Sequence, residues 1–233
     1  MAAQTHKTPD VSIPPIGLQG TLRVPHAAYA IVVFAHGSGS SRLSPRNRAV
    51  ADALNARGIA TLLFDLLTPA EEADRTNVFD IPLLALRLVD AISWVDRQPS
   101  LAGLPLGLFG ASTGAAAALT AAADLPDRVN ALVSRGGRPD LPGEALDRVR
   151  APTLLVVGGI DFVVIELNEL ALERLQGAKA LEVIPGASHL FPEPGALEAV
   201  IDHAGRWFER YLLPSSAKQS TTDVVTGGKR KRL

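Results

Sequence analysis

Short apolar segments alternate with helical segments along most of this chain, and this alternation constrains the fold more than any other feature. Residues 30–35, 59–64 and 106–109 contain almost no polar side chains, as is typical of strands that are covered on both faces. Further strands are predicted at residues 20–24, 129–133, 153–157 and 180–184. Strands that alternate with helices form a mostly parallel sheet with helices on both faces. The sequence therefore predicts the α/β fold class, in which ligands bind beyond the carboxyl ends of the strands.

The helices between these strands carry recognisable start and stop signals. Ser44 and Pro45 begin a helix that Gly58 ends, and Asp80 caps a longer amphipathic helix that runs to about residue 97. Other helices are predicted at residues 112–123, 164–175 and 195–211, with a short one near 143–149. A polar segment at residues 68–77 is expected to cross the surface.

The two ends of the chain lack this pattern. We predict an N-terminal arm over residues 1–18, one α/β domain over residues 19–213, and a disordered basic tail over residues 214–233. The tail ends in four consecutive basic residues, 229–232. Such a cluster at a terminus is more often a solvated end than a targeting signal.

Composition excludes several classes of protein. The net charge of the 233 residues is −1 and only 5% are aromatic, so neither a basic face nor stacking platforms for nucleic acid are expected. The chain has no cysteine, which excludes disulfides, thiolate metal sites and a cysteine nucleophile. No signal peptide is visible, and the longest apolar run is too short to span a bilayer. We expect a cytoplasmic protein without a nucleic-acid or membrane partner.

The segment 106–123 carries the strongest chemical signal. An apolar strand leads to Gly110-Ala111-Ser112-Thr113-Gly114, and an alanine-rich helix follows. A sharp turn between strand and helix brings its flanks close together, which favours glycine two residues before and after the apex. The turn would raise the Ser112 hydroxyl above the sheet. Ser112 is therefore the predicted nucleophile, although a Gly-x-Ser-x-Gly string also arises by chance.

A serine nucleophile needs a base and a group that orients the base. His189 lies in an irregular loop after the strand 180–184, and Asp161 follows the strand 153–157. The order Ser112, Asp161, His189 is that of the α/β-hydrolase triad, and each residue lies just beyond a strand. Each residue also has a non-catalytic alternative. Asp161 could be only a helix cap, and His189 could be only an exposed loop residue. Asp65 and Glu166 are the reserve acids.

An ester carbonyl that is attacked becomes an oxyanion, which requires two hydrogen-bond donors. The Thr113 amide at the start of the helix is the first predicted donor. The second should come from the loop that begins at His36, with the Ser38 amide as the first choice and Gly37 as the alternative. His36 is expected to organise this loop rather than to act as a base.

Three motifs together resemble the α/β-hydrolase superfamily, and specifically its small dienelactone hydrolase-like branch. They are Gly-Ala-Ser-Thr-Gly, the strand that leads into His-Gly-Ser-Gly-Ser-Ser, and Gly-Gly-Ile-Asp ahead of Gly-Ala-Ser-His. The resemblance spans about residues 22–213. It implies a carboxylic ester or lactone hydrolase with a Ser112 acyl-enzyme, no metal and no organic cofactor. Characterised dienelactone hydrolases carry cysteine where this chain has Ser112, so dienelactone itself is not the expected substrate. Ile160 is a second departure, because a polar residue such as arginine is expected before the acid, and it concerns the geometry of the acid loop.

The segment between the strands at 129–133 and 153–157 is short, whereas larger relatives insert a lid there. We therefore expect a minimal lid or none, and a shallow site for small acyl groups. Several arginines are predicted at the rim: Arg42, Arg46, Arg75, Arg135 and Arg138. Arg135 and Arg138 are candidate contacts for an anionic substrate, although exposed arginines more often remain solvated or pair with aspartate.

The leading function is a serine hydrolase that cleaves a small carboxylic ester, thioester or lactone. The alternatives are a non-catalytic binding protein on the same scaffold and an acyltransferase. The oligomeric state is not predictable from these residues.

Overall fold

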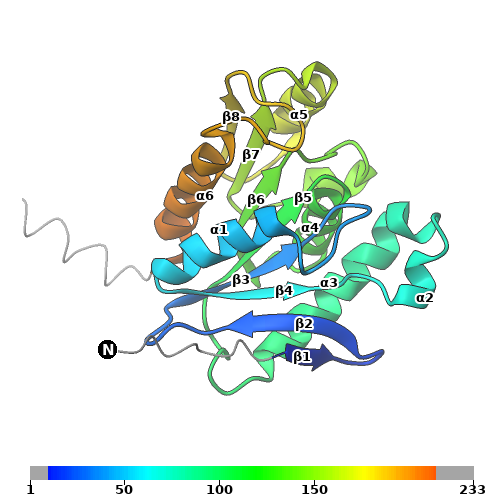
Figure 1. The fold of residues 1–233 in the computed structure, drawn as a ribbon, viewed down its shortest axis with the longest axis vertical. Coiled ribbons are helices and arrows are strands. Elements are labelled where there is room, and N and C mark those ends of the chain that lie inside the picture. Colours follow the sequence, from blue (N-terminus) through cyan, green and yellow to red (C-terminus); the bar gives the residue numbers. More distant parts are fainter. Residues whose placement is uncertain (1–9, 214–233) are drawn as a thin grey trace, which may run out of the picture.

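The computed structural model describes residues 10–213 as one open sheet of eight strands with helices on both faces (Figure 1). The strand order is β1-β2-β4-β3-β5-β6-β7-β8. The strands are β1 (Asp10–Ile13), β2 (Leu18–Arg23), β3 (Ala30–Ala35), β4 (Ile59–Phe64), β5 (Leu106–Ala111), β6 (Val129–Arg135), β7 (Thr153–Gly158) and β8 (Lys179–Ile184). In this order, all neighbouring strands from β4 to β8 are parallel. β2 is antiparallel to its two neighbours, β1 and β4. The predicted fold class is confirmed.

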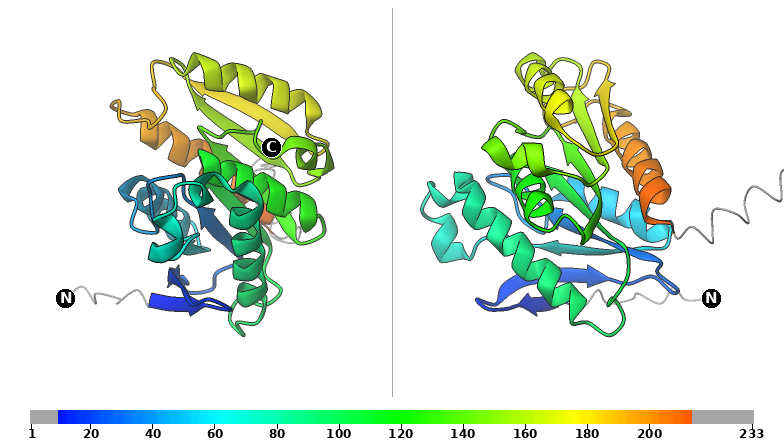
Figure 2. Two further views of the ribbon diagram at one scale, coloured as in Figure 1. Left: turned by 90° about the vertical axis from the view of Figure 1, so that its right-hand side faces the viewer. Right: turned by 180° about the vertical axis from the view of Figure 1, so that it is seen from behind.

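The helices form two layers, one on each face of the sheet (Figure 2). They are α1 (Pro45–Ala56), α2 (Pro69–Glu72), α3 (Ile81–Asp96), α4 (Thr113–Asp124), α5 (Phe162–Arg174) and α6 (Ala196–Leu212), with 3₁₀ turns η1 (Asn77–Phe79) and η2 (Gly143–Arg148). Buried residues of α1 and α6 share one apolar core with the sheet, and those of α3, α4 and α5 share the other. Because both faces are covered, β3, β4, β5 and β7 are almost entirely apolar.

The local signals for the start and end of two helices are confirmed. The Ser44 hydroxyl accepts a hydrogen bond from the Asn47 amide at the start of α1, and Gly58 follows that helix with a φ of 79°. The Asp80 carboxylate accepts from the Leu83 amide at 3.0 Å and so caps α3. These caps satisfy backbone amides that have no partner inside the helix.

The predicted N-terminal arm over residues 1–18 is wrong for residues 10–18. Residues 10–13 form β1, which pairs with residues 18–21 of β2, and Gly17 turns the chain with a φ of 78°. The two prolines before this turn obscure a strand that has only four residues. Residues 1–9 and the predicted tail at 214–233 lie outside the described residues.

The strand β6 is two residues longer than the predicted segment 129–133. Ser134 and Arg135 continue it because β5 pairs with both on one side and β7 pairs with both on the other. Two polar residues in succession argue against a buried strand, but pairing on both sides outweighs that preference. Arg135 therefore lies within the sheet rather than in a loop. The polar segment 68–77, for which no element was predicted, contains α2 and the start of η1.

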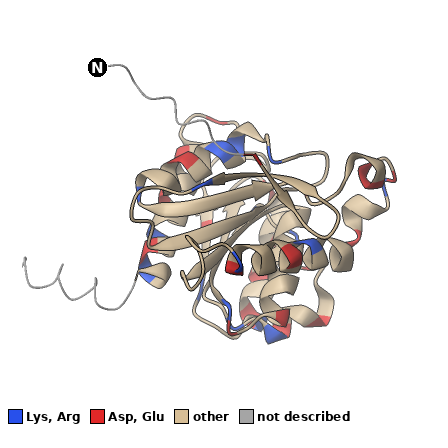
Figure 3. Cartoon of the chain, turned by 90° about the horizontal axis from the view of Figure 1, so that it is seen from below, with Lys and Arg blue, Asp and Glu red and all other residues tan. Residues whose placement is uncertain are grey.

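Charged residues of both signs are distributed along the helices and loops around the sheet, as the colours of the cartoon show (Figure 3). The view shows acidic and basic residues intermixed rather than gathered on one face. Within residues 10–213, no helix has both the length and the apolar character needed to cross a membrane.

Candidate active site

Ser112 is the apex of the turn between β5 and α4. Its φ of 52° and ψ of −122° are rarely adopted by residues with a side chain, so the turn stores backbone strain. A Cβ at Gly110 would lie 2.4 Å from the Ala115 Cα, and one at Gly114 would lie 2.3 Å from the Ala35 carbonyl oxygen. Neither position has room for a side chain. Ser112 is only partly buried, which leaves it open to a ligand.

The Ser112 backbone is also held from the neighbouring strand. Its amide donates to the Arg135 carbonyl at the end of β6, at 3.2 Å. The surrounding sheet thus fixes the strained conformation, which an isolated turn would not keep.

His189 and Asp161 meet at the same edge of the sheet. The imidazole Nδ1 and the carboxylate Oδ2 are 2.7 Å apart. Asp161 occupies the position that caps α5, but its side chain accepts no hydrogen bond from that helix. The helix-cap alternative therefore does not describe this carboxylate. An Nδ1–H donated to Asp161 leaves the lone pair of Nε2 available to accept a proton.

Backbone contacts place His189 near Ser112. Gly136 follows the residue that binds the Ser112 amide, and a Cβ at Gly136 would lie 3.5 Å from both Nδ1 and Cε1 of His189. The Ser112 hydroxyl makes no hydrogen bond to the imidazole in the described part of the chain. Such contacts are often long without substrate and shorten in the reactive complex.

The loop that carries His189 is tied down on both sides. The Ser188 amide donates to the Glu193 carboxylate at 3.1 Å, and hydrogen bonding to Ser188 lowers the pKa of Glu193. The Ile160 amide donates to the Ala187 carbonyl at 3.0 Å, which joins the acid loop to the histidine loop. Ile160 thus contributes through its backbone, and its side chain is exposed.

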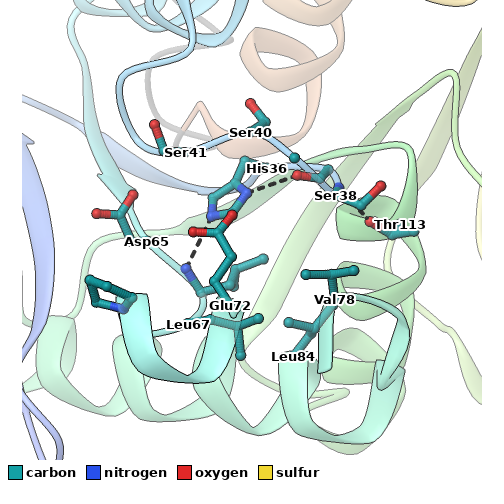
Figure 4. A pocket seen from close by; sticks show the side chains of 14 residues that line it. His36, Ser38, Ser40, Ser41, Asp65, Leu67, Glu72, Val78, Leu84 and Thr113 are labelled. Atoms are coloured by element: carbon teal, nitrogen blue, oxygen red, sulfur yellow. Dashed lines mark hydrogen bonds between the residues drawn. The ribbon is translucent and has the colours of Figure 1, made fainter. Parts of the chain in front are cut away.

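His36 links two loops and is not placed as a second base. Its Nε2 accepts from the Leu66 amide at 3.1 Å, and its Nδ1 lies 3.0 Å from the Gly37 carbonyl oxygen (Figure 4). One nitrogen accepts and the other donates, so these contacts fit a neutral ring. Burial lowers the pKa of His36, which agrees with that protonation state. The expectation that His36 organises its loop fits this geometry.

The predicted oxyanion donors lie together, but one is already engaged. Thr113 is buried at the first position of α4, and its hydroxyl accepts from the Ser38 amide at 2.9 Å. Gly37 lies against Ser112, because a Cβ there would be 3.0 Å from the Ser112 Cβ. The Ser38 amide must leave the Thr113 hydroxyl before it can bind an oxyanion. Both loop donors considered from the sequence remain candidates.

A cavity of about 100 Å³ opens beside these donors. Ser38 and Thr113 line one end of it, and Leu67, Val78 and Leu84 form an apolar floor (Figure 4). The cavity is thus continuous with the candidate oxyanion site and can receive a small apolar group. The floor of the cavity comes from α3 and the region before it. The sequence analysis did not predict that these residues belong to the site.

The remaining candidate residues differ in whether they are already paired. The Asp65 carboxylate binds the Arg42 guanidinium at 2.7 Å, and Glu166 is exposed on α5, so neither reserve acid is placed to orient His189. Arg138 is held by Asp140 through two hydrogen bonds of 2.8 and 2.6 Å. Arg135 is only 7% exposed.

Two contacts could not have been found from sequence patterns. The Thr113 hydroxyl meets the Ser38 amide across 75 positions, and Gly136 packs against the imidazole of His189. No pattern among neighbouring residues in the sequence predicts either contact. Among residues 10–213, no group of three or more histidine, aspartate or glutamate side chains is placed to hold a metal ion.

Comparison with known proteins supplies close relatives. Two Mycobacterium tuberculosis proteins, from strains CDC 1551 / Oshkosh and ATCC 25618 / H37Rv, are each 60% identical to this chain over 198 residues. Both are named "Putative phosphoribosyl transferase". The match covers 85% of this chain but 45% of each relative, so the chain spans about half the length of the curated relatives it matches.

Solved structures agree with the fold. A dienelactone hydrolase from Anabaena variabilis ATCC 29413 is 56% identical, with a TM-score of 0.85, and the match covers 88% of this chain and 97% of that one. A Xanthomonas campestris protein described as a serine hydrolase without a lid is 22% identical, with a TM-score of 0.73 and coverage of 92% and 100%. At that identity the second likeness shows the fold alone.

The family model described as "Alpha/beta hydrolase domain" matches residues 28–202. This range contains Ser112, Asp161 and His189 together with the loop that begins at His36. The chain belongs to the α/β-hydrolase family, in its dienelactone hydrolase-like branch.

Proposed function

We propose that this protein is a serine hydrolase that cleaves a small carboxylic ester, thioester or lactone. The observation that carries the proposal is the strained, partly exposed Ser112 at the same edge of the sheet as the 2.7 Å pair of His189 and Asp161. A binding protein would not need this combination, because backbone strain lowers stability and is retained mainly at functional sites.

The proposed reaction has two halves. Ser112 Oγ attacks the substrate carbonyl while His189 Nε2 accepts the hydroxyl proton, and the leaving group receives that proton from the imidazolium. Asp161 holds the ring and stabilises its charged form. Water then attacks the Ser112 acyl-enzyme in the same manner, which releases the acid and restores the serine.

The Thr113 amide and one amide of the loop 36–38 would stabilise the oxyanion. Loss of one such donor typically costs about 3 kcal/mol in the barrier. If Ser38 is that donor, substrate must displace the Thr113 hydroxyl from its amide. If Gly37 is that donor, the contact between Thr113 and Ser38 can persist and hold the loop in place.

The size of the cavity favours small substrates. Its volume is about 100 Å³, whereas an engineered cavity of about 150 Å³ admits benzene. The connection between β6 and β7 contains only η2 as regular structure, so it offers little covering for a long acyl chain. An open site with a shallow apolar recess suits short acyl groups.

The name of the M. tuberculosis relatives does not assign an activity to this chain. It describes whole proteins, of which this chain matches 45%. We therefore derive the proposed function from the residues around Ser112. Acyl transfer to an acceptor other than water would use the same acyl-enzyme.

A fluorophosphonate probe tests the assignment of the nucleophile. We expect labelling of the unaltered protein and complete loss of labelling in Ser112→Ala. Ser40→Ala is the matched control, because Ser40 is a serine in the lining of the adjoining cavity, and this variant should still be labelled. Labelling that persists in Ser112→Ala would contradict the assignment, and no labelling of the unaltered protein would favour the binding protein.

A further inference from the structure

Asn168 is a polar residue on the buried side of α5, where the other buried residues are Val164 and Ala171. It is 0% exposed, and burial of an amide is unfavourable unless hydrogen bonds replace those made to water. Its Nδ2 donates to the Val164 carbonyl at 2.7 Å and to the Gly137 carbonyl at 3.1 Å. The first bond stays within the helix. The second crosses 31 positions and joins α5 to the loop that follows β6.

That loop, residues 136–138, touches both the turn at Ser112 and the loop that carries His189. The Arg138 amide donates to the Ser112 carbonyl at 3.4 Å. A Cβ at Gly136 would lie 3.2 Å from the His189 carbonyl oxygen and 3.5 Å from two atoms of its ring. The position of the loop 136–138 therefore determines the surface against which the imidazole packs.

The loop 136–138 depends on external contacts for its conformation. Gly136 and Gly137 are successive glycines, which have little conformational preference of their own. A Cβ at Gly137 would lie 2.0 Å from the Ser134 Oγ and 2.7 Å from the Ala115 Cβ, so its Cα packs closely against β6 and α4. The Asn168 amide holds the carbonyl of the same residue from α5. Loss of this bond would leave the peptide group after Gly137 without its partner in α5.

The same helix carries the carboxylate that binds His189. α5 begins directly after Asp161, and the Ile165 amide donates to the Asp161 carbonyl at 2.9 Å. Asn168 follows about two turns later, roughly 10 Å along the helix axis. A helix that is attached to the loop 136–138 at this point keeps the carboxylate in a fixed position relative to the ring that packs on that loop.

We propose that Asn168 is a positioning residue for the triad, because it ties the helix that carries Asp161 to the loop against which His189 packs. The proposal rests on the proposed hydrolase function and adds a residue outside the reacting groups. Asn168 is fully buried and does not touch substrate, so its loss should impair the chemical step rather than binding. A misplacement of about 1 Å in a reacting group can lower a rate about 100-fold.

Asn168→Ser removes the bond to Gly137 but keeps a polar group that has a partner. A serine hydroxyl in a helix donates to the carbonyl four residues earlier, as Thr120 in α4 donates to the Ala116 carbonyl at 3.0 Å. The serine hydroxyl would therefore bind the Val164 carbonyl, and the contact between α5 and the loop 136–138 is what the substitution removes.

Asn55→Ser in α1 is the matched control. The Asn55 Nδ2 also donates to a backbone carbonyl, that of Ile59 at 2.9 Å, and its Oδ1 is buried without a partner among the described residues, as is the Oδ1 of Asn168. Ile59 begins β4, so this contact lies at the amino ends of the parallel strands. The triad residues follow the carboxyl ends, at the opposite edge of the sheet.

Kinetics with 4-nitrophenyl acetate provide the first test, at a temperature at which every variant is folded. In Asn168→Ser we expect kcat to fall about tenfold or more with KM within about threefold of the unaltered protein. Asn55→Ser should lower the Tm but leave kcat within about twofold, because only stability is affected. A kcat of Asn168→Ser that is no lower than that of Asn55→Ser, or a loss confined to KM, would overturn the positioning role.

NMR of the imidazole provides a test that does not require turnover. The carbon-bound ring protons of His189 correlate with Nδ1 and Nε2 in long-range 1H–15N spectra, and the nitrogen shifts report which nitrogen of the neutral ring carries the proton. These signals are identified by their loss in His189→Gln. In the unaltered protein we expect the proton on Nδ1, where Asp161 Oδ2 lies 2.7 Å away. Asn168→Ser should increase the fraction with the proton on Nε2, and Asn55→Ser should not.

The outcomes separate the positioning role from the hydrolase function. If hydrolysis depends on Ser112 but Asn168→Ser changes neither kcat nor the tautomer of His189, the positioning role is wrong and the hydrolase remains. If the unaltered protein cleaves no ester and is not labelled by a fluorophosphonate, the hydrolase function fails and the tautomer alone decides the positioning role. If Asn168→Ser does not fold, Asn168→Thr, which leaves a smaller cavity, replaces it in both measurements.

Discussion

At the scale of single residues, conformation and protonation determine what the site can do. Ser112 carries a side chain at a φ of 52°, a region that glycine adopts without steric cost. His36 is kept neutral between two backbone groups, although histidine can ionise near physiological pH. The strained backbone of Ser112 and the neutral ring of His36 are both locally unfavourable states that the surrounding structure stabilises.

Ser112→Gly should be more stable than Ser112→Ala. Both variants lack the hydroxyl, but alanine keeps a Cβ in the strained conformation and glycine does not. We expect the free energy of unfolding of the glycine variant to be higher by about 1 kcal/mol or more, as measured by denaturant unfolding. Equal stabilities would show that the turn is not strained, and neither variant should be labelled by a fluorophosphonate.

His36 should make stability depend on pH on the acidic side. Because its pKa is lowered in the folded state, the unfolded chain takes up the proton first as pH falls below about 6.5. The free energy of unfolding should therefore fall with acidification, by up to about 1.4 kcal/mol per pH unit from this group. The contribution of neutral His36 to the free energy of unfolding is fully present above that pH. In His36→Gln, denaturant unfolding between pH 7.5 and 5.5 should show a smaller decrease, and an identical decrease would contradict this role.

At the scale of elements, the site depends on how closely α4 approaches β3. Gly114 lies in the first turn of α4, where an added Cβ would meet two carbonyl oxygens of β3 and its loop at 2.3 and 2.4 Å. Backbone atoms of a central strand cannot move aside as a flexible side chain can. The small residues of α4 therefore serve the contact between helix and strand as well as helix formation.

Gly114→Ala should displace α4 and with it the Thr113 amide. We expect a loss of about 1–3 kcal/mol in the free energy of unfolding from overpacking, together with a decrease in kcat/KM of at least tenfold. Thr120→Ala in the same helix changes an ordinary position and should alter stability by less than about 1 kcal/mol. A Gly114→Ala protein with unaltered activity would contradict the close approach.

At the scale of the whole molecule, the sheet brings three distant loops to one edge. Ser112 follows β5, Asp161 follows β7 and His189 follows β8, and all three strands are parallel. Parallel strands present their carboxyl ends on the same side, so the loops after them converge. The cavity beside the candidate oxyanion donors is small, which predicts a limit on substrate size.

The protein should prefer short acyl chains. We expect kcat/KM for 4-nitrophenyl acetate or butyrate to exceed that for the octanoate at least tenfold, because the apolar floor ends within a cavity of about 100 Å³. A series of esters of graded length measures this directly. A rate that rises through the octanoate would show that a longer groove receives the chain.

Much of this protein could be predicted from the sequence because the signals are local. The apolar runs predict the parallel strands, Asp80 and Ser44 predict helix starts, and Gly110 and Gly114 predict the turn at Ser112. These features depend on side-chain periodicity and on the backbone freedom of single residues, which neighbouring residues alone determine. The short strand β1 escaped because four residues carry too little periodic signal.

Only the tertiary structure decided which polar groups meet. Asp161 could have capped α5, but its carboxylate binds His189 instead. Ser134 and Arg135 extend β6 because strands distant in sequence pair with them, and Arg135 is only 7% exposed there. Contacts between residues far apart in the chain depend on the packing of whole elements. No local sequence pattern contains this packing information. The partners of charged groups follow from the packing, so the sequence alone does not predict them.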